Sequence, residues 1–463
     1  MTSAPERPVI HEDVATRAAR GKARRRVVPR SALAAWEPTA GRPDPAALLR
    51  EQELTRVPEL VPLRHERMTA SPFAFYRGAA AIMASDLAQG PRTDLWVQCC
   101  GDAHLANFGG FASPERSLVF DINDFDETSP GPFEWDVKRL ATSFEIAGRT
   151  LELADEQRRT VVVRVSKAYR DAMAGFAGMT NLAIWYARLD LETVLATAEK
   201  VLPERAGALR RGLAKARAKD SAKAARKLTA LVDGELRFVT SRPELVALSD
   251  LYQDAERDEL FEWLRDRIRG YRQSLPEPLR VLLERYRLVD FARKVVGVGS
   301  VGTRCWIALM LGRDNDDPLI LQIKQAEASV LEPYGGGAEP HHGKRVVDGQ
   351  RLLQSSSDIM LGWLSAVGVD GVGRDFYVRQ LWDGKISADI ESMRPEGLAF
   401  YADMCGWTLA RGHAVSGDPV AIAAYLGGQD RFETAMADFA AAYADQNQRD
   451  FDVVKAQVAA GLL

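Results

Sequence analysis

The side chains best suited to chemistry gather in one short stretch, GDAHLANFGG at residues 101–110. Asp102 follows an apolar run, Asn107 comes five residues later, and Asp124 lies just past a second apolar run. A carboxylate can orient an acceptor hydroxyl and take its proton, while an amide and a second carboxylate can hold magnesium on phosphates. The set matches a known arrangement for phosphoryl transfer, and this match implies Asp102 as the catalytic residue and Asn107 and Asp124 as magnesium ligands.

Alternative interpretations of this stretch stay open. Asp102 could only cap a turn, with its side chain on backbone amides. Asp121 and Asp126 lie in the same acidic cluster as Asp124, and Asp121 is kept as a further metal ligand. Asp136, near the start of the next expected helix, would either brace the Asp102 loop or be favoured there by the helix dipole alone.

A second chemical group comes nearly two hundred residues later in the chain. Gly297, Gly299 and Gly302 stand between two β-type runs, which favours a hairpin that lays its backbone over phosphates rather than a dinucleotide-binding turn into a helix. Lys324 ends the next apolar strand, and we expect its ammonium to contact the α- and β-phosphates of ATP. The alternative is a water-exposed lysine on an edge strand.

Such a lysine is usually held by an acid on a nearby helix. Asp348 is the candidate for this cofactor-binding role, and Glu327 is the second choice. Near the N-terminus, Tyr76 and Arg77 would face the site and contact an anion, or Arg77 would only pair with Asp86 or a helix end.

The stretch from Gly101 to Asn107 resembles the Gly-Asp-x-His-x-x-Asn loop of small-molecule kinases such as the aminoglycoside phosphotransferases. Together with Ser71–Gly78, Asn123–Glu127 and Arg293–Gly302, it also resembles the bacterial domain-of-unknown-function 2252 family, from about Asp44 to the C-terminus. This resemblance implies an α+β, protein-kinase-like fold of two lobes, with ATP and Mg²⁺ as cofactors and no known substrate.

The order of the segments differs from that of familiar kinases, in which the Gly-rich hairpin and the lysine precede the catalytic Asp. If both assignments hold, the fold is circularly permuted, which is physically plausible where termini lie close together at the surface. We expect a basic, flexible tail over residues 1–43, followed by a mostly helical large lobe over 44–290 that holds the catalytic loop and the metal site. A small antiparallel β lobe that binds nucleotide should follow over 291–385, and C-terminal helices that return to the large lobe should follow over 386–463.

Hydrophobic periodicity predicts the elements within these segments. Residues 95–100 and 118–122 should be strands that together form a hairpin-like floor beneath the site, and residues 158–290 should be helical almost throughout. Further helices are expected at 73–87, 133–148, 344–366, 396–413 and 430–458, and further strands at 295–298, 303–311, 319–324 and 376–381.

Bulk properties exclude several classes of function. The net charge of −3 argues against general nucleic-acid binding, and no apolar run has the length of a membrane span. The four cysteines show neither metal-ligand spacing nor a disulfide framework, and no secretory signal is evident, so we expect a cytoplasmic protein.

The leading hypothesis is an ATP- and magnesium-dependent phosphotransferase acting on an unknown small-molecule or protein acceptor. One alternative is a non-catalytic, nucleotide-binding regulator that uses the same pocket. Others are a metal-dependent phosphohydrolase and an enzyme that transfers the AMP portion of the nucleotide.

Overall fold

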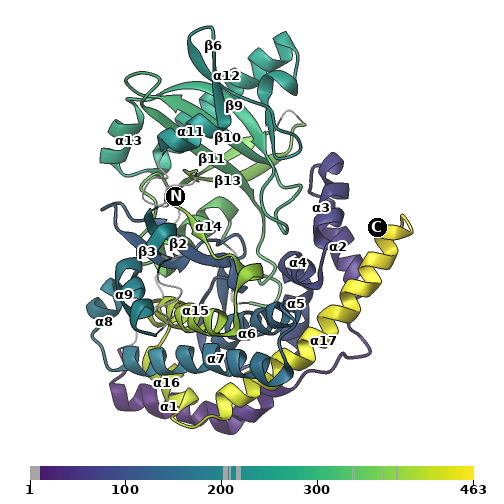
Figure 1. The fold of residues 1–463 in the computed structure, drawn as a ribbon, viewed down its shortest axis with the longest axis vertical. Coiled ribbons are helices and arrows are strands. Elements are labelled where there is room, and N and C mark those ends of the chain that lie inside the picture. The colour runs from purple at the N-terminus through teal and green to yellow at the C-terminus, as the bar shows by residue number, and fades with distance from the viewer. Residues whose placement is uncertain are drawn as a thin grey trace.

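The chain folds into a mixed α/β structure, obtained as a computed structural model (Figure 1). It describes residues 11–201, 207, 210–214, 221–335, 337, 339–368, 370–381 and 384–463. We call residues 221–381 the sheet region, which forms the upper part of Figure 1, and residues 11–201 with 384–463 the helical region, which forms the lower part.

One antiparallel sheet organises the sheet region, with strand order β12-β13-β11-β10-β9-β8. Its strands are β8 (Leu245–Ala247), β9 (Arg287–Lys294), β10 (Cys305–Leu311), β11 (Pro318–Ala326), β12 (Gly362–Val367) and β13 (Gly373–Gln380). A separate hairpin of β6 (Thr229–Val232) and β7 (Glu235–Phe238) and the helices α11 (Ser221–Leu228), α12 (Asp254–Tyr271), α13 (Glu277–Leu283) and α14 (His342–Leu353) accompany it. The strands predicted at 303–311, 319–324 and 376–381 are thus confirmed within a few residues. The strand predicted at 295–298 is wrong, because β9 ends at Lys294 and the Gly-rich segment that follows is a loop.

Both faces of this sheet are covered, which explains its nearly continuous apolar strands. Along β10, Ala308 and Met310 join the core that includes Leu264 of α12, while Ile307 and Leu309 join the core that includes Ala225 and Leu228 of α11. Because successive strand residues point to opposite faces, one strand contributes to two cores.

The boundary predicted at residue 291 is wrong, because residues from 221 onward already pack on the sheet. The helical pattern over 158–290 is interrupted by β8 and the β6–β7 hairpin, and Leu245 and Phe238 share a core with β10. Likewise, the helix expected over 344–366 ends at Leu353, and β12 follows it. Part of the segment predicted to be helical, at 202–206, 208–209 and 215–220, lies outside the described residues.

Helices dominate the helical region, and α6 (Phe133–Thr150) lies buried at its centre. Around it are α7 (Asp155–Ala177), α15 (Pro395–Ser416), α16 (Pro419–Leu426) and α17 (Arg431–Ala459), which confirms the helices predicted at 133–148, 396–413 and 430–458. The remaining helices are α1 (Val14–Val27), α2 (Pro45–Glu53), α3 (Val61–Met68), α4 (Pro72–Gly78), α5 (Ala80–Gln89), α8 (Asn181–Tyr186) and α9 (Leu191–Val201). The single helix predicted over 73–87 is therefore two helices, α4 and α5.

Two small sheets flank the segments that hold the predicted site residues Asp102, Asn107 and Asp124. The strand β1 (Trp96–Cys99) pairs with β4 (Ser129–Pro132), and β2 (Phe108–Ala112) and β3 (Leu118–Ile122) lie in a sheet ordered β14-β2-β3-β5. The short outer strands of that sheet are β5 (Leu189–Asp190) and β14 (Ile386–Ser387). The predicted hairpin of residues 95–100 with 118–122 is therefore wrong, because β1 pairs with β4, whereas β3 pairs with β2 and β5.

The flexible tail predicted over residues 1–43 is also not observed among residues 11–43. Helix α1 packs on α16, where Arg17 donates to Asp418 at 2.9 Å and Arg25 donates to the carbonyl of Tyr425 at 2.7 Å. The arginines that indicated a solvated segment thus bind the ends of another helix, a contact that composition alone does not reveal. Residues 1–10 lie outside the described residues.

Candidate active site

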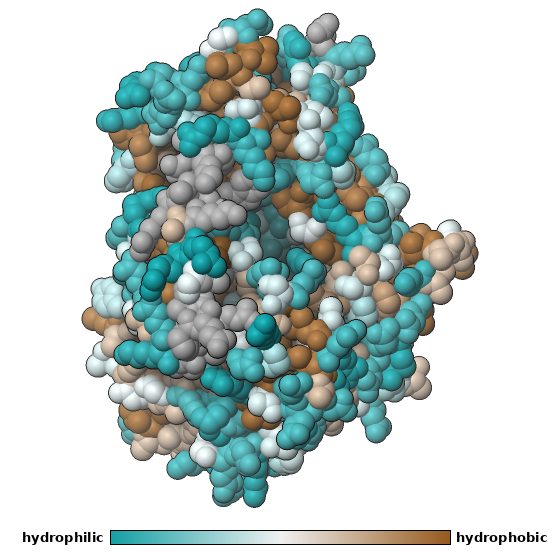
Figure 2. All heavy atoms as spheres, viewed as in Figure 1, coloured by the Kyte–Doolittle hydropathy of each residue, from teal (hydrophilic) through white to brown (hydrophobic). Residues whose placement is uncertain are grey.

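A cleft of about 1050 Å³ separates the sheet region from the helical region. Figure 2 shows the molecule hollowed at this level, with hydrophilic side chains around the opening. The lining residues include Asn107 and Asp124 from the helical region and Lys324 and Arg379 from the sheet. The early acidic segment and the late lysine-bearing strand therefore meet at one cleft, as the sequence predicted.

The sheet wall of the cleft is built by alternation along two paired strands. Lys324 and Gln322 of β11 lie opposite Tyr377 and Arg379 of β13, respectively. Their neighbour Ile323 turns to the apolar core beneath. The Nε of Arg379 donates to Gln322 at 3.0 Å, and its Nη1 donates to the carbonyl of Asn123 at 3.3 Å. Because successive side chains of a strand point to opposite faces, Lys324 and Arg379 both face the cleft from neighbouring strands.

Lys324 is buried, with a side chain only 3 % exposed, so the exposed edge-strand interpretation is wrong. Its ammonium pairs with the carboxylate of Asp126 and donates to Ser300 Oγ at 2.8 Å. Tyr377 donates to the other oxygen of Asp126 at 2.8 Å. Burial alone would lower the pKa of Lys324, but Asp126, Tyr377 and Asp124 together raise it, so the side chain stays charged.

The acid that holds Lys324 is therefore Asp126, not Asp348 or Glu327. Asp348 lies on α14 with a half-exposed side chain and pairs with Lys344 at 2.8 Å. Glu327 accepts a hydrogen bond from Gln325 at 2.9 Å. The spacing of residues in the sequence does not show which acidic side chain lies near a lysine in space. The prediction from spacing therefore named the wrong partner.

Gly101 and Asp136 shape the loop that carries Asp102. Gly101 has a φ of +82°, and a Cβ there would lie 2.0 Å from the carbonyl oxygen of Glu127, so only glycine fits. Asp136 accepts hydrogen bonds from the backbone N–H groups of Cys100 at 2.7 Å and Gly101 at 3.1 Å. The predicted bracing by Asp136 is confirmed, and it fixes the backbone immediately before Asp102.

Asp102 itself is held by Arg139 of α6, whose Nε donates to Oδ1 at 2.6 Å. The other oxygen, Oδ2, lies 3.7 Å from Nε2 of His104, whose pKa is well below its ordinary value because of burial. Burial raises the pKa of Asp102, although Arg139 and Arg77 oppose this shift. The Asp102 side chain is 21 % exposed, and Asp102 is not among the residues that line the cleft.

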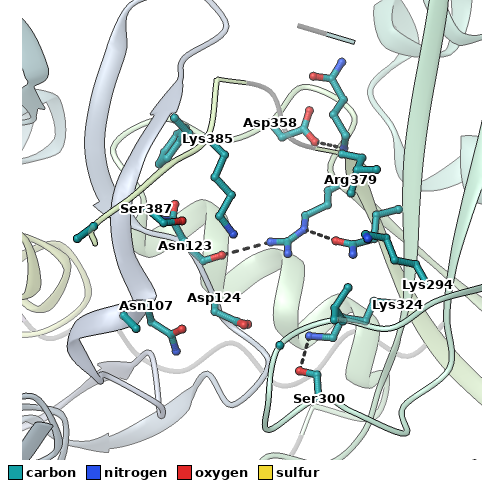
Figure 3. Close-up of a pocket in the computed structure, with 18 of the residues that line it drawn as sticks. Asn107, Asn123, Asp124, Lys294, Ser300, Lys324, Asp358, Arg379, Lys385 and Ser387 are labelled. Carbon is teal, nitrogen blue, oxygen red and sulfur yellow. Dashed lines mark hydrogen bonds between the residues drawn. The ribbon is translucent and has the colours of Figure 1, made fainter. Parts of the chain in front are cut away.

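The two predicted magnesium ligands that line the cleft are Asn107 and Asp124 (Figure 3). Asn107 donates from Nδ2 to the carbonyl of Asp102 at 2.8 Å, which ties its side chain to the loop. Figure 3 shows the carboxylate of Asp124 between Asn107 on one side and Lys324 on the other. Burial and the neighbouring Asp126 raise the pKa of Asp124, as expected for a carboxylate among like charges before a cation binds.

Asp121 does not share this position. Its Oδ2 accepts hydrogen bonds from the backbone N–H and the hydroxyl of Ser355, both at 2.8 Å, and its side chain is buried away from the lining residues. The metal role predicted for Asp121 therefore does not fit the geometry. Among the described residues, no group of three or more His, Cys, Asp or Glu side chains forms a metal site. A magnesium ion here would depend on Asn107, Asp124 and the oxygens of a ligand.

The Gly-rich loop links β9 to β10 above the cleft. Gly297 and Gly302 have positive φ values of 64° and 91°. A Cβ at Gly299 would lie 3.0 Å from the carbonyl oxygen of Arg77, so this glycine allows the loop to approach α4 closely. Ser300 of the same loop donates to Asp126 at 3.2 Å, which draws the loop toward the acidic segment.

Several residues of the cleft escaped the sequence analysis. Arg379 and Lys385 line it, and the ammonium of Lys385 points into the same space in Figure 3. Burial and the nearby Arg379 lower the pKa of Lys385 to about 8. Arg379 carried a weak signal, since Asp375, Tyr377 and Arg379 place polar groups at every second position, which indicates a strand face that is not core. Lys385 follows the strand in an irregular segment and carried none.

Taken together, the fold and the cleft define a mixed α/β protein with buried cations and carboxylates facing one another between two regions. Residues 56–457 match the family described as an uncharacterized protein conserved in bacteria (DUF2252). The match covers most of the chain, which therefore belongs to this family. No curated protein and no solved structure matches the chain. None of the described helices combines the length and apolarity needed to cross a membrane.

Proposed function

We propose that the protein is an ATP- and Mg²⁺-dependent phosphotransferase with a circularly permuted, protein-kinase-like fold. The observation that carries this proposal is that Lys324 and Asp124, from opposite walls, line one cleft although they lie 200 residues apart in the chain. Phosphoryl transfer of the kinase type needs such a lysine and such a carboxylate around the same phosphates.

The strand arrangement gives further support. Counting from β9, the Gly-rich loop joins the first and second strands, Lys324 lies on the third, and α14 joins the third to the fourth. Protein kinases place their Gly-rich loop and lysine in the same way. In this chain the sheet region is followed by α15 and α17, and the Asp102 loop comes from the first half of the chain, which is the order of a permuted kinase.

In this proposal the lysine and the loop backbone from Gly297 to Gly302 bind the phosphates of ATP. Asn107 and Asp124 hold Mg²⁺, which neutralises charge on the transferred group when it is bound. Asp102 takes the proton of the acceptor hydroxyl, and its raised pKa suits a general base. The acceptor is a small molecule or a protein side chain with a hydroxyl group.

A nucleotide-binding test comes first. ATP, ADP and GTP are added with and without Mg²⁺, and the thermal unfolding temperature is recorded. We expect Mg²⁺-dependent stabilisation by nucleotide, because a ligand that binds only the folded state raises its stability. Asp124→Ala should abolish the Mg²⁺-dependent part, whereas Asp403→Asn, on the surface of α15 and paired with Arg164, is the matched control. A wild-type protein that is not stabilised by any nucleotide would refute the proposal.

Asp102→Asn separates catalysis from binding. We expect this variant to keep nearly wild-type nucleotide affinity and to lose turnover by about 10²-fold or more, the usual contribution of a positioned general base. Turnover is followed as ADP release from ATP in the presence of a pool of bacterial metabolites. Unchanged turnover would remove Asp102 from the mechanism.

One observation favours a second candidate, a non-catalytic nucleotide-binding regulator. Asp102 is engaged by Arg139 and does not line the cleft directly. In a regulator this ion pair would be purely structural. Nucleotide binding by the wild-type protein, with no transfer to any acceptor and no hydrolysis, would favour this candidate.

A further inference from the structure

Arg77 is one of the cleft cations to which the proposed function gives no role. It lies at the end of α4, and its side chain lines the cleft together with Asn107 and Asp124. The alternative pairing with Asp86 is excluded, because Asp86 accepts from Arg42 at 2.7 Å and from Tyr443 at 2.7 Å. Arg77 is therefore placed to act on what the cleft holds.

The backbone of α4 is fixed against both catalytic loops at once. The carbonyl of Tyr76 accepts from Nη2 of Arg139 at 2.9 Å, and the Nε of the same guanidinium binds Asp102. The hydroxyl of Tyr76 donates to the carbonyl of Arg139 at 2.8 Å, and the guanidinium carbon lies 4.4 Å from the Tyr76 ring centre. One residue further on, the carbonyl of Arg77 touches the Gly-rich loop at Gly299. Arg77 thus stands between the loop that would cover the phosphates and the loop that carries Asp102.

The charges around Arg77 come from the two carboxylates of the proposed reaction. Burial lowers the pKa of Arg77, and Asp102 and Asp124 are the groups that oppose this shift. Its Nε is buried and has no hydrogen-bond partner within the part of the chain that the structure describes. A buried guanidinium donor without a partner is costly, and carboxylate and phosphoryl oxygens are the acceptors that match its planar geometry.

We propose that Arg77 binds the phosphoryl group during its transfer, an inference that rests on the proposed function. In that step the acceptor oxygen forms a bond to the γ-phosphorus, and the bond between this phosphorus and the β–γ bridging oxygen breaks. ADP leaves with the bonding electrons, and the acceptor proton goes to Asp102. Arg77 neutralises charge on the oxygens of the transferred phosphoryl group, while Lys324 remains bound to the phosphates of the leaving nucleotide.

The test compares a nucleotide that has a γ-phosphoryl group, the group that Arg77 would touch, with one that lacks it. Mg²⁺-ADP and Mg²⁺-AMP-PNP, a non-hydrolysable ATP analogue, are titrated calorimetrically into the wild-type protein, Arg77→Met and Arg77→Lys. We expect Arg77→Met to bind ADP within about twofold of wild type and AMP-PNP at least about tenfold more weakly, the loss expected for hydrogen bonds between charged groups. Arg77→Lys keeps the charge but not the planar fork, so its loss should be intermediate.

Arg92→Met is the matched control, because this arginine lies on the surface near Trp96 and pairs with Asp94 at 3.0 Å. Equal weakening of both nucleotides, or unchanged AMP-PNP affinity, in Arg77→Met would overturn the role of Arg77. A wild-type protein that binds neither nucleotide would refute the proposed function instead. Unfolding temperatures without ligand show whether Arg77→Met is folded, and Arg77→Lys carries the comparison if it is not.

Discussion

At the residue scale, the buried ammonium of Lys324 depends on Asp126. Removing one partner of a buried ion pair leaves an uncompensated charge, which costs about 3–5 kcal/mol. We expect Asp126→Ala to lower the free energy of unfolding in urea by about 3 kcal/mol, toward the low end because the Asp126 side chain is 24 % exposed. Asp403→Ala, which breaks a surface pair, should change it little.

A double variant tests the coupling itself. Lys324→Met together with Asp126→Ala removes both charges, so it should be more stable than the sum of the two single losses predicts. Simple additivity of the losses would show that the two side chains do not stabilise each other.

Glu127 gives the fold a defined dependence on pH. Burial raises its pKa to about 7 from an unfolded-state value near 4.5, although the backbone N–H of Val330 and the charge of Arg345 oppose the shift. Because the folded-state value is the higher one, this contribution to stability is complete below about pH 4.5 and is lost as the pH rises through 7. Between pH 5 and pH 8, the free energy of unfolding of the wild-type protein in urea should fall by about 2–3 kcal/mol relative to that of Glu127→Gln. Parallel stability curves for the two proteins would contradict it.

Single residues show what the sequence could and could not predict about the site. Asp102, Asn107, Asp124 and Lys324 stand out because the proposed chemistry requires their types and local spacing. The choice of Asp126 over Asp348 depends on how two distant segments meet, and no local pattern encodes that.

At the scale of elements, α14 lies tightly against the loop that follows the acidic segment. Gly349 is inside this helix, where glycine is ordinarily unfavourable, and a Cβ there would lie 2.4 Å from Cγ2 of Thr128. We therefore expect Gly349→Ala to destabilise the protein by about 1–3 kcal/mol through overpacking, despite the better helix propensity of alanine. Gly175→Ala on α7, which meets nothing within 4 Å, should be neutral or stabilising by up to about 1 kcal/mol.

A compensating change checks the mechanism of this loss. Thr128→Ser removes the offending methyl group but keeps the hydroxyl that donates to the carbonyl of Cys99 at 2.7 Å. Adding it to Gly349→Ala should recover part of the loss in thermal unfolding. No recovery would mean that the methyl group is not the main source of the loss, since the Thr128 hydroxyl oxygen would also lie 2.6 Å from the added Cβ.

Elements with strong periodicity were predicted well, and elements defined by partners were not. The long helices α15 and α17 and the strands β10 and β11 carry their hydrophobic pattern within their own residues. In contrast, β8 is three residues long and is a strand only because β9 pairs with it. The pairing of β1 with β4 depends in the same way on a segment thirty residues away.

At the scale of the whole molecule, α1 and the residues that follow it bind both ends of α16. Arg25 and Arg30 bind carbonyls at the last turn of α16, and Asp418, the N-cap of α16, is paired with Arg17. A cap contributes about 1 kcal/mol at each helix end, so deleting residues 1–28 should lower the free energy of unfolding by at least about 2 kcal/mol. Deleting residues 1–10 alone is the reference. Equal unfolding temperatures for the two truncated proteins would show that the contacts of α1 with α16 do not stabilise the protein.

The helical region is assembled from both ends of the chain, with the whole sheet region inserted between them. Helix α6, which carries Asp136 and Arg139, is covered by α17, the last helix of the chain. During synthesis on a ribosome, the Asp102 loop is therefore made early but must wait for the final residues before its supporting core is complete. The sheet region, which is continuous in sequence, can close first, so the nascent chain exposes the apolar surface of α6 for most of its translation.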